Sequence, residues 1–249
     1  MKILTWNVAH QTHKNNKNLS HMAEALASLS ADILVLNEYV PGKYHQKFTE
    51  DLESYGYKIK ISPPPESPDD RQNQILIASR ISIENGTIHP PRITPAVYTN
   101  VLHVRIPDKH FDVIGLRVPD IRSKDKVSLH KTWQWITEIA HEIRDKPFII
   151  LGDLNNDTGT PEPDGGSRFD QLKDDGWLRA PASGYSFWSK KFKPVSRIDH
   201  ALFTRHFTVK KAEYITHNQG VFFTKTCETN SSDAMSDHAV LLVEFDLID

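Results

Sequence analysis

The sequence has only one cysteine, Cys227, among 249 residues, so no disulfide can form within the chain. It has no apolar run of about 20 residues, the length that a membrane-spanning helix requires. Its first ten residues, MKILTWNVAH, lack the apolar segment of a secretory signal peptide. We therefore expect a protein of the cytoplasm that does not insert into a membrane. The formal net charge is -2, which excludes the strong overall positive field of a protein that binds nucleic acid chiefly by charge.

The composition is that of a folded protein with a substantial core, since 38% of the residues are hydrophobic and 25% are charged. Apolar segments of strand length occur at 3–8, 33–36, 75–77, 97–106, 111–116, 148–151, 198–203 and 240–245. Two helical patterns lie between them, with apolar side chains on one face from Leu19 to Leu29 and from Leu129 to Ile143. No linker or repeat interrupts this alternation, so the sequence predicts an α/β fold in a single domain, residues 1–249.

Polar residues occur where several of these apolar segments end. The clearest example is FIILGDLNND, from Phe148 to Asp157, where four apolar residues run into a glycine and then into carboxylates and amides. Other segments deliver polar side chains in the same way: Asn7 in ILTWNV, Glu38 in ILVLNEY, Asp199 in SRIDHALF, and Asp237 and His238 in SDHAVLLVEF. Loops at one end of an α/β sheet converge, and ligands bind there. We therefore expect these residues to meet around one centre.

Each of these residues, taken alone, is more often a turn residue or a helix cap than a functional residue. Residues 153–157 have the alternate spacing of a calcium-binding loop, but Thr158 replaces the required glycine and Asp164 replaces the bidentate glutamate. Ser236 lacks the Gly-x-Ser-x-Gly context of a serine nucleophile. A single cysteine excludes the usual thiolate zinc sites. The functional prediction therefore depends on the joint pattern of the strand ends.

Six segments, in this order along the chain, match the motifs of a known family: TWNV, LNEY, GDLNND, YSFW, RIDHALF and SDHAV. They resemble the endonuclease/exonuclease/phosphatase family, which includes abasic-site endonucleases, deoxyribonuclease-type enzymes, sphingomyelinases and inositol-polyphosphate phosphatases. The resemblance extends from about Lys2 to Phe245. It implies a four-layer α/β sandwich, in which two mixed β-sheets pack face to face with helices on the outside. It also implies a metal-dependent phosphoester hydrolase with its site where the two halves meet.

The resemblance implies a metal end formed by Glu38, Asn7 and Asp237, with Asn7 also close to the substrate. Mg²⁺ is the expected ion and Mn²⁺ the alternative, because Mg²⁺ is held by one or two carboxylates while it keeps waters and substrate oxygens. Ala9 stands where abasic-site enzymes often carry a further carboxylate near the metal. This departure argues against a second carboxylate at that position, beside Glu38, in the metal end.

The residues that would face the phosphate are implied in the same way. Asp153 would align or deprotonate the attacking water, and Asn155 would orient it and contact a phosphate oxygen. His238 would donate hydrogen bonds to the phosphoryl oxygens, with Asp199 on its other nitrogen favouring the protonated form. Arg117, in GLRVPD, stands where family members commonly place His or Tyr against the phosphate. It could clamp the phosphate or form a salt bridge at the rim.

The segment GYSFWSKKFKPVSR interleaves aromatic residues with cations. Tyr185, Phe187 and Trp188 could stack on bases while Lys190, Lys191 and Lys193 contact phosphates, although Phe187 and Trp188 could equally be part of the core. Resemblance to the abasic-site enzymes, which have a similar aromatic pair near the substrate, favours a contact role for at least one of these two. We therefore expect DNA or RNA as the substrate, cleaved by in-line attack of water, and a monomer with no obligate protein partner. A small-molecule or lipid phosphoester is the alternative substrate. A non-catalytic nucleic-acid-binding module with the same fold is the rival of a different class.

Overall fold

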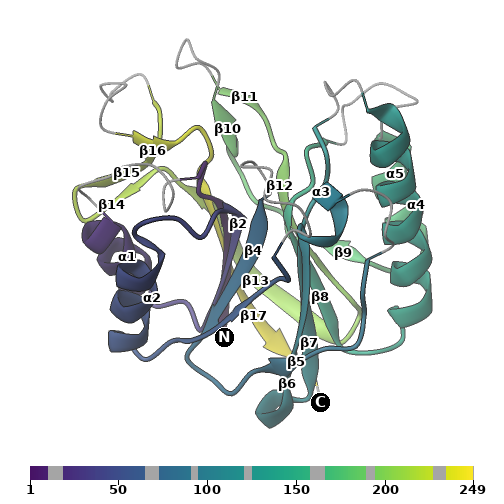
Figure 1. Cartoon of the computed structure of the whole chain (residues 1–249). Helices are drawn as coiled ribbons and strands as arrows, with labels where there is room; N and C mark the ends of the chain where they lie inside the picture. The colour runs from purple at the N-terminus through teal and green to yellow at the C-terminus, as the bar shows by residue number, and fades with distance from the viewer. Residues whose placement is uncertain are drawn as a thin grey trace.

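The computed structural model describes residues 1–10, 19–64, 73–90, 95–120, 125–157, 166–188, 194–226 and 234–248. Its centre is a pair of six-stranded β-sheets (Figure 1). The first sheet has the order β13 (Phe207–Ile215), β17 (Val240–Leu247), β1 (Lys2–Asn7), β2 (Ile33–Tyr39), β4 (Gln74–Ser79), β3 (Lys58–Ile61). The second has the order β5 (Glu84–Asn85), β6 (Val101–Ile106), β7 (Phe111–Arg117), β8 (Phe148–Asp153), β12 (Asp199–Phe203), β9 (Leu178–Arg179). Each sheet is mixed, because β1–β2 and β7–β8 are parallel pairs whereas β1–β17 and β8–β12 are antiparallel.

The two sheets pack face to face over a shared apolar core. Its members include Ile3, Val35 and Ile77 from the first sheet and Val113, Ile149 and Phe203 from the second. Gly115 in β7 shows how closely the sheets approach, because a Cβ at this position would lie 2.7 Å from Cγ1 of Val35 in the opposite sheet. A larger residue at position 115 would therefore push the two sheets apart.

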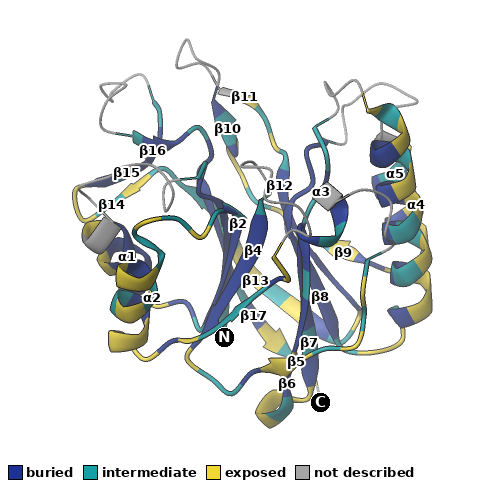
Figure 2. Ribbon diagram, in the orientation of Figure 1, coloured by how far each residue is buried: buried dark blue, intermediate teal, exposed yellow. Residues whose placement is uncertain are grey.

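Helices cover the outer face of each sheet, with α1 and α2 on the first sheet and α4 and α5 on the second (Figure 1). The helices are α1 (Leu19–Ser28), α2 (His45–Ser54), the short α3 (Pro95–Tyr98), α4 (Lys126–Ile143) and α5 (Gly166–Asp174), with a 3₁₀ turn η1 (Pro107–Lys109). Met22 and Phe48 pack under the first pair, and Trp133 and Phe169 under the second. Figure 2 shows the four long helices buried toward the sheets and exposed on the opposite side. The predicted four-layer α/β sandwich is confirmed.

Shorter strands extend the sandwich on one side. β10 (Phe187–Trp188) pairs with β11 (Pro194–Ser196), while β14 (His217–Asn218), β15 (Val221–Thr224) and β16 (Ala234–Ser236) form a three-stranded sheet. Both units lie at the top of the molecule in Figure 1. No helix among the described residues has the length and apolar character that crossing a membrane requires.

The prediction of one strand over 97–106 is wrong at its start. Residues Pro95–Tyr98 form the helix α3, and the strand begins at Val101. The proline ring fixes φ near the helical value and is favoured at the first position of a helix, which explains the helical turn. Each of the other seven predicted strand segments overlaps one strand of the structure, and both predicted helices are present.

Candidate active site

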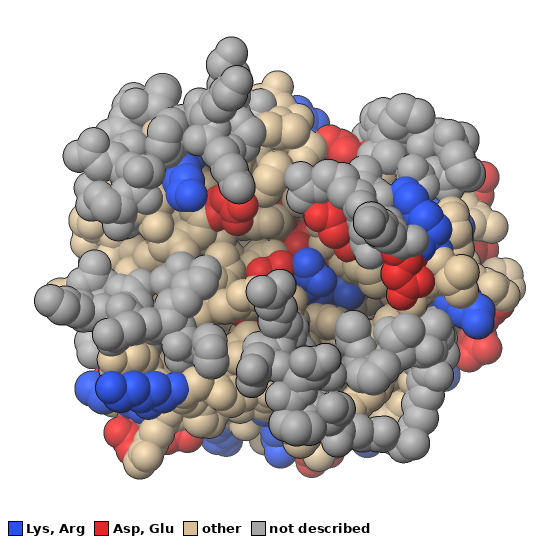
Figure 3. Space-filling view, turned by 45° about the horizontal axis from the view of Figure 1, so that its top comes forward, with Lys and Arg blue, Asp and Glu red and all other residues tan. Residues whose placement is uncertain are grey.

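The polar strand ends meet at one edge of the sandwich because of the sheet topology. β1 and β2 are parallel and pair Asn7 with Asn37, while β7 and β8 are parallel and pair Arg117 with Asp153. β12 runs antiparallel to β8 and begins at Asp199, opposite Asp153. β17 runs antiparallel to β1, so the residues just before it reach the same edge. A pocket of about 230 Å³ lies there, and Figure 3 shows acidic and basic side chains around a hollow.

The glycine in FIILGDLNND is required by the close approach of β7. Gly152 has a φ of 150°, and a Cβ at this position would lie 1.8 Å from the carbonyl oxygen of Leu116. The chain then turns at Asn155, whose φ of 49° lies in the left-handed region that asparagine tolerates. This turn brings the backbone N–H of Asn155 to Oδ1 of Asp153 at 3.0 Å. The local sequence thus holds Asp153 and Asn155 together at the end of β8.

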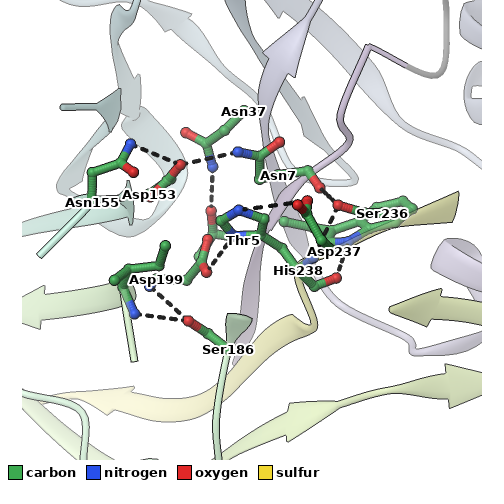
Figure 4. A network of polar contacts seen from close by, with 12 residues as sticks. Thr5, Asn7, Asn37, Asp153, Asn155, Ser186, Asp199, Ser236, Asp237 and His238 are labelled. Atoms are coloured by element: carbon green, nitrogen blue, oxygen red, sulfur yellow. Dashed lines mark hydrogen bonds and ion pairs between the residues drawn. The ribbon is translucent and has the colours of Figure 1, made fainter. Parts of the chain in front are cut away.

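Asp153 is 1% exposed. Its Oδ2 accepts hydrogen bonds from two amide groups. Nδ2 of Asn7 lies 3.0 Å from Oδ2 of Asp153, and Nδ2 of Asn155 lies 3.1 Å from the same atom (Figure 4). Nδ2 of Asn155 also donates to the carbonyl oxygen of Val118 at 2.8 Å. These hydrogen bonds fix the orientation of the Asp153 carboxylate.

Burial raises the pKa of Asp153 to about 7, because the charged carboxylate loses its hydration. Among the charged neighbours, His238 and Arg117 lower this pKa, whereas Asp199 and Glu38 raise it. A carboxyl group whose pKa lies near neutrality is suited to proton transfer at physiological pH.

Asp199 and His238 form a buried ion pair. Oδ2 of Asp199 lies 2.8 Å from Nδ1 of His238, and the two side chains are 0% and 7% exposed. Burial alone would lower the pKa of His238, but the charge and hydrogen bond of Asp199, and then the charges of Asp153 and Asp237, raise it to about 10. His238 is therefore an imidazolium at neutral pH. Its Nε2 lies 3.9 Å from Oδ1 of Asp237, beyond hydrogen-bonding distance, so this N–H can be donated to a ligand.

Two serine hydroxyls fix the backbone on either side of the ion pair (Figure 4). Oγ of Ser186 accepts from the backbone N–H of Asp199 at 3.1 Å. Oγ of Ser236 accepts from the backbone N–H of His238 at 3.1 Å and donates to the carbonyl oxygen of Asn7 at 2.7 Å. The hydroxyl of Ser236 is therefore engaged with the backbone at the end of β16, which agrees with its lack of a nucleophile context in the sequence.

Glu38 lies on a bulge of β2. The register between β2 and β4 shifts between Leu36 and Tyr39, and Glu38 has a φ of 50°. The carboxylate reaches the pocket, where Oε1 lies 2.8 Å from Nη2 of Arg117 and Oε2 lies 3.3 Å from Nε2 of His10. Burial opposes ionisation of Glu38, but the charges of Arg117, His10 and His238 and a hydrogen bond from Asn7 together hold its pKa below the ordinary value.

The pocket contains oxygen donors of the kind that Mg²⁺ and Mn²⁺ bind. Four carboxylates line it: Glu38, Asp120, Asp153 and Asp237. In addition, ligand atoms of Asp153, Asp199 and His238 lie within 4.8 Å of one another. This second group is a poor metal site, because the hydrogen bond to Asp199 keeps His238 protonated and an imidazolium has no lone pair to offer. The side of the pocket that carries Glu38 and Asp237 fits a cation better.

The predicted aromatic contacts differ in their exposure. Tyr185 is 43% exposed, with the guanidinium of Arg197 located 6.0 Å from its ring centroid. Trp188 is only 9% exposed, whereas the neighbouring Phe187 lines the pocket with its ring centroid 5.2 Å from that of His238. The predicted cations Lys190, Lys191 and Lys193 lie outside the described residues.

Two charged or titratable residues that line the pocket, His10 and Asp120, were not predicted from the sequence, and Phe187 of the predicted aromatic segment lines it as well. His10 and Asp120 could have been found from their positions, because each lies three residues after the end of a strand, at Asn7 or Arg117. Phe187 precedes Trp188 in YSFW, and the sequence alone does not indicate which of two adjacent aromatic side chains faces a pocket.

Comparison with known proteins places the chain in a family. The sequence profile of the Endonuclease/Exonuclease/phosphatase family matches residues 4–238. No curated protein matches the chain in sequence.

Several solved structures share its fold. An AP endonuclease from Archaeoglobus fulgidus superposes with a TM-score of 0.72 at 19% identity, and the 3'-5' exonuclease NExo from Neisseria meningitidis with 0.71 at 22%. A mannosyl-6-phosphatase from Bacteroides thetaiotaomicron VPI-5482 superposes with 0.67 at 16%. Each comparison covers 99% of this chain and 100% of the other.

The family profile covers nearly the whole chain, and the solved structures share its four-layer architecture. The order of strands in the two sheets explains why polar residues from five segments, those after β1, in β2, after β7, after β8 and before β17, reach one pocket. The chain therefore belongs to the endonuclease/exonuclease/phosphatase family and is a phosphoester hydrolase of the metal-dependent type.

Proposed function

We propose that the protein hydrolyses phosphodiesters by in-line attack of water, with DNA or RNA as the substrate and Mg²⁺, or Mn²⁺ in its place, as the cation. The observation that carries this proposal is the pocket that brings His238, with its partner Asp199, to Asp153 and Glu38. A phosphodiester is anionic, so its hydrolysis requires neutralised charge, an aligned water and a stabilised leaving oxygen. His238 supplies a positive charge, Asp153 a proton acceptor, and Glu38 a carboxylate that binds the metal ion.

Glu38 and Asp237 would hold the divalent cation, with the amide oxygen of Asn7, which also accepts from the backbone N–H of Ala9, as a further oxygen ligand. A bound divalent cation supplies neutralisation of the phosphate charge and of the charge that develops on the leaving oxygen. Glu38 suits this role because its lowered pKa keeps it ionised at neutral pH. Asp237 suits it because its side chain is 45% exposed and can reorient without disturbing the core.

Asp153 is the group that aligns the attacking water and accepts its proton, since its pKa of about 7 is matched to neutral pH. Asn155 holds that carboxylate in place, because its Nδ2 donates to Oδ2 of Asp153 and to the carbonyl oxygen of Val118. His238 donates its Nε2–H to a phosphoryl oxygen and counters the negative charge of the transition state. Asp199 is a positioning residue that keeps the imidazole ring oriented and protonated.

The charge of the pocket favours a diester over a monoester. Four carboxylates line it, against the cations Arg117 and His238. A phosphodiester carries one negative charge, whereas a phosphate monoester carries between one and two near neutral pH, so the diester meets less repulsion. Exposed Tyr185 and its neighbour Arg197 offer a ring for base stacking and a cation for a phosphate. These features support nucleic acid as the substrate.

A phosphatase that acts on a small molecule is the second candidate. The observation in its favour is the pocket volume of about 230 Å³, which suits a small phosphorylated ligand. The structures that share this fold include a mannosyl-6-phosphatase as well as an AP endonuclease, so the fold accommodates both classes of substrate.

A substrate panel distinguishes these candidates. Single- and double-stranded DNA and RNA oligonucleotides, bis(p-nitrophenyl) phosphate and p-nitrophenyl phosphate are each incubated with the protein and Mg²⁺ or Mn²⁺, with His238→Gln as the matched control. We expect cleavage of an oligonucleotide and of the diester, and little release from the monoester. Strong monoester hydrolysis with intact oligonucleotides would establish the phosphatase. Oligonucleotide binding without turnover of any substrate would establish the non-catalytic binding module.

A further inference from the structure

Arg117 lies between two carboxylates of the pocket. Its Nη2 is 2.8 Å from Oε1 of Glu38, and its Nε is 3.7 Å from Oδ2 of Asp153. The side chains of Arg117 and Glu38 are 18% and 17% exposed, so their contact is largely shielded from water. Oε2 of Glu38 faces Nε2 of His10 at 3.3 Å. Both oxygens of the carboxylate that we assign to the cation are therefore in contact with basic groups.

A divalent cation at Glu38 would meet the positive charge of Arg117. A guanidinium group stays protonated at all physiological pH values, so this charge cannot be removed by loss of a proton. Repulsion between like charges a few ångströms apart is strong where water is largely excluded. The cation therefore binds weakly while Arg117 remains against Glu38.

Arg117 also has a donor available for a phosphate. Its Nε–H is buried and has no hydrogen-bond partner among the described residues. A buried donor without a partner is unfavourable, and the planar fork of a guanidinium matches two oxygens of a phosphate. A phosphate group in the pocket would satisfy this donor and draw the guanidinium away from Glu38.

We propose that Arg117 makes cation binding depend on substrate binding. In the free protein, the guanidinium neutralises Glu38 and weakens its affinity for a divalent cation. When a phosphate group enters, Arg117 transfers its hydrogen bonds to the phosphate oxygens, and Glu38 becomes available. Cation and phosphate then bind cooperatively, and by linkage each raises the affinity of the other by the same factor. This inference rests on the proposed function, which assigns the cation to Glu38 and the phosphate to this pocket.

Titration of the full chain with Mn²⁺, with the free ion measured by electron paramagnetic resonance, tests the proposal without substrate turnover. Arg117→Gln removes the competing charge and should bind Mn²⁺ roughly tenfold more tightly than the wild type, within the usual range of coupling between sites. Arg105 on β6 pairs with Asp112 on β7, outside the pocket. Arg105→Gln therefore removes the same charge at a distant place and should leave the Mn²⁺ affinity unchanged. Adding Glu38→Gln to Arg117→Gln should abolish the gain.

Inorganic phosphate, below the solubility limit of its Mn²⁺ salt, tests the cooperativity. Phosphate should raise the Mn²⁺ affinity of the wild type by roughly the same tenfold factor and should have no effect on Arg117→Gln. Arg117→Lys keeps the charge and should retain the weak affinity, which shows that the gain in Arg117→Gln comes from the lost charge and not from the altered side chain. The proposal is overturned if Arg117→Gln, folded by circular dichroism, binds Mn²⁺ no more tightly than the wild type, or if phosphate leaves the wild-type affinity unchanged. Failure of the hydrolysis panel alone would overturn the proposed function but not this linkage.

Discussion

Replacement of Asp199 by asparagine should remove the positive charge of His238 at neutral pH. The change keeps the size of the side chain and a hydrogen-bond acceptor for Nδ1–H, but it deletes the negative charge 2.8 Å away. The rise in the pKa of His238 from 6.5 to about 10 corresponds to about 5 kcal/mol in favour of the imidazolium, at 1.36 kcal/mol per pH unit. Asp199 is the largest favourable contributor, and burial opposes it. In Asp199→Asn the titration midpoint of His238 should therefore fall below about pH 8.

NMR spectra of the histidine Cε1–H groups between pH 6 and 10.5 measure this midpoint, and His238→Gln identifies the resonance among the 13 histidines. Asp237→Asn is the matched control, because its carboxylate is 45% exposed and 3.9 Å from Nε2, so solvent screens its charge and the midpoint should move little. A wild-type midpoint near 6.5, or a midpoint that stays above pH 9 in Asp199→Asn, would refute the assignment of His238 as an imidazolium held by Asp199.

The same ion pair makes stability depend on pH. Because the folded-state pKa of His238 lies above 6.5, its contribution to stability is complete below pH 6.5 and is lost as the pH rises through about 10. In urea titrations, the difference in free energy of unfolding between the wild type and Asp199→Asn should therefore shrink over that range. A difference that stays constant would contradict this. Asp153→Asn and His238→Ala should each lower kcat by roughly 10²-fold or more, and a near-normal rate in a folded variant would remove that residue from the mechanism. Arg117→Ala should raise KM more than it lowers kcat at saturating Mg²⁺, whereas the opposite result would make it a transition-state group.

The sequence predicts most of the pocket because its residues stand at the ends of apolar strands. Asn7, Asp153 and Asp199 each border a run of buried residues, and parallel or antiparallel pairing then determines which edge of the sheet they share. The contact between Arg117 and Glu38 could not be predicted, because it depends on a bulge that gives Glu38 a positive φ. Local backbone geometry of this kind leaves no periodic pattern in the sequence.

Elements that bury little apolar surface were also missed. Strand β13 has nine residues, FTVKKAEYI, and lies at the edge of its sheet with several exposed residues. It therefore lacks the continuous apolar run by which the predicted strands were recognised. Trp188 was named as a contact residue from the resemblance of the aromatic pair to the family, whereas a β-bridge to His238 places the ring of Phe187 beside it. A two-residue strand is too short for its alternation to reveal which side chain faces inward.

Chelation tests most directly the central claim that this pocket hydrolyses a phosphodiester with a divalent cation. The initial rate of bis(p-nitrophenyl) phosphate hydrolysis is measured in Mg²⁺, after addition of excess EDTA, and after Mg²⁺ is restored, with His238→Gln treated in parallel. We predict that EDTA abolishes wild-type hydrolysis, that Mg²⁺ restores it, and that the variant stays at least roughly 10²-fold slower with Mg²⁺ present. Wild-type hydrolysis that persists unchanged in EDTA, while the variant remains inactive, would contradict the claim.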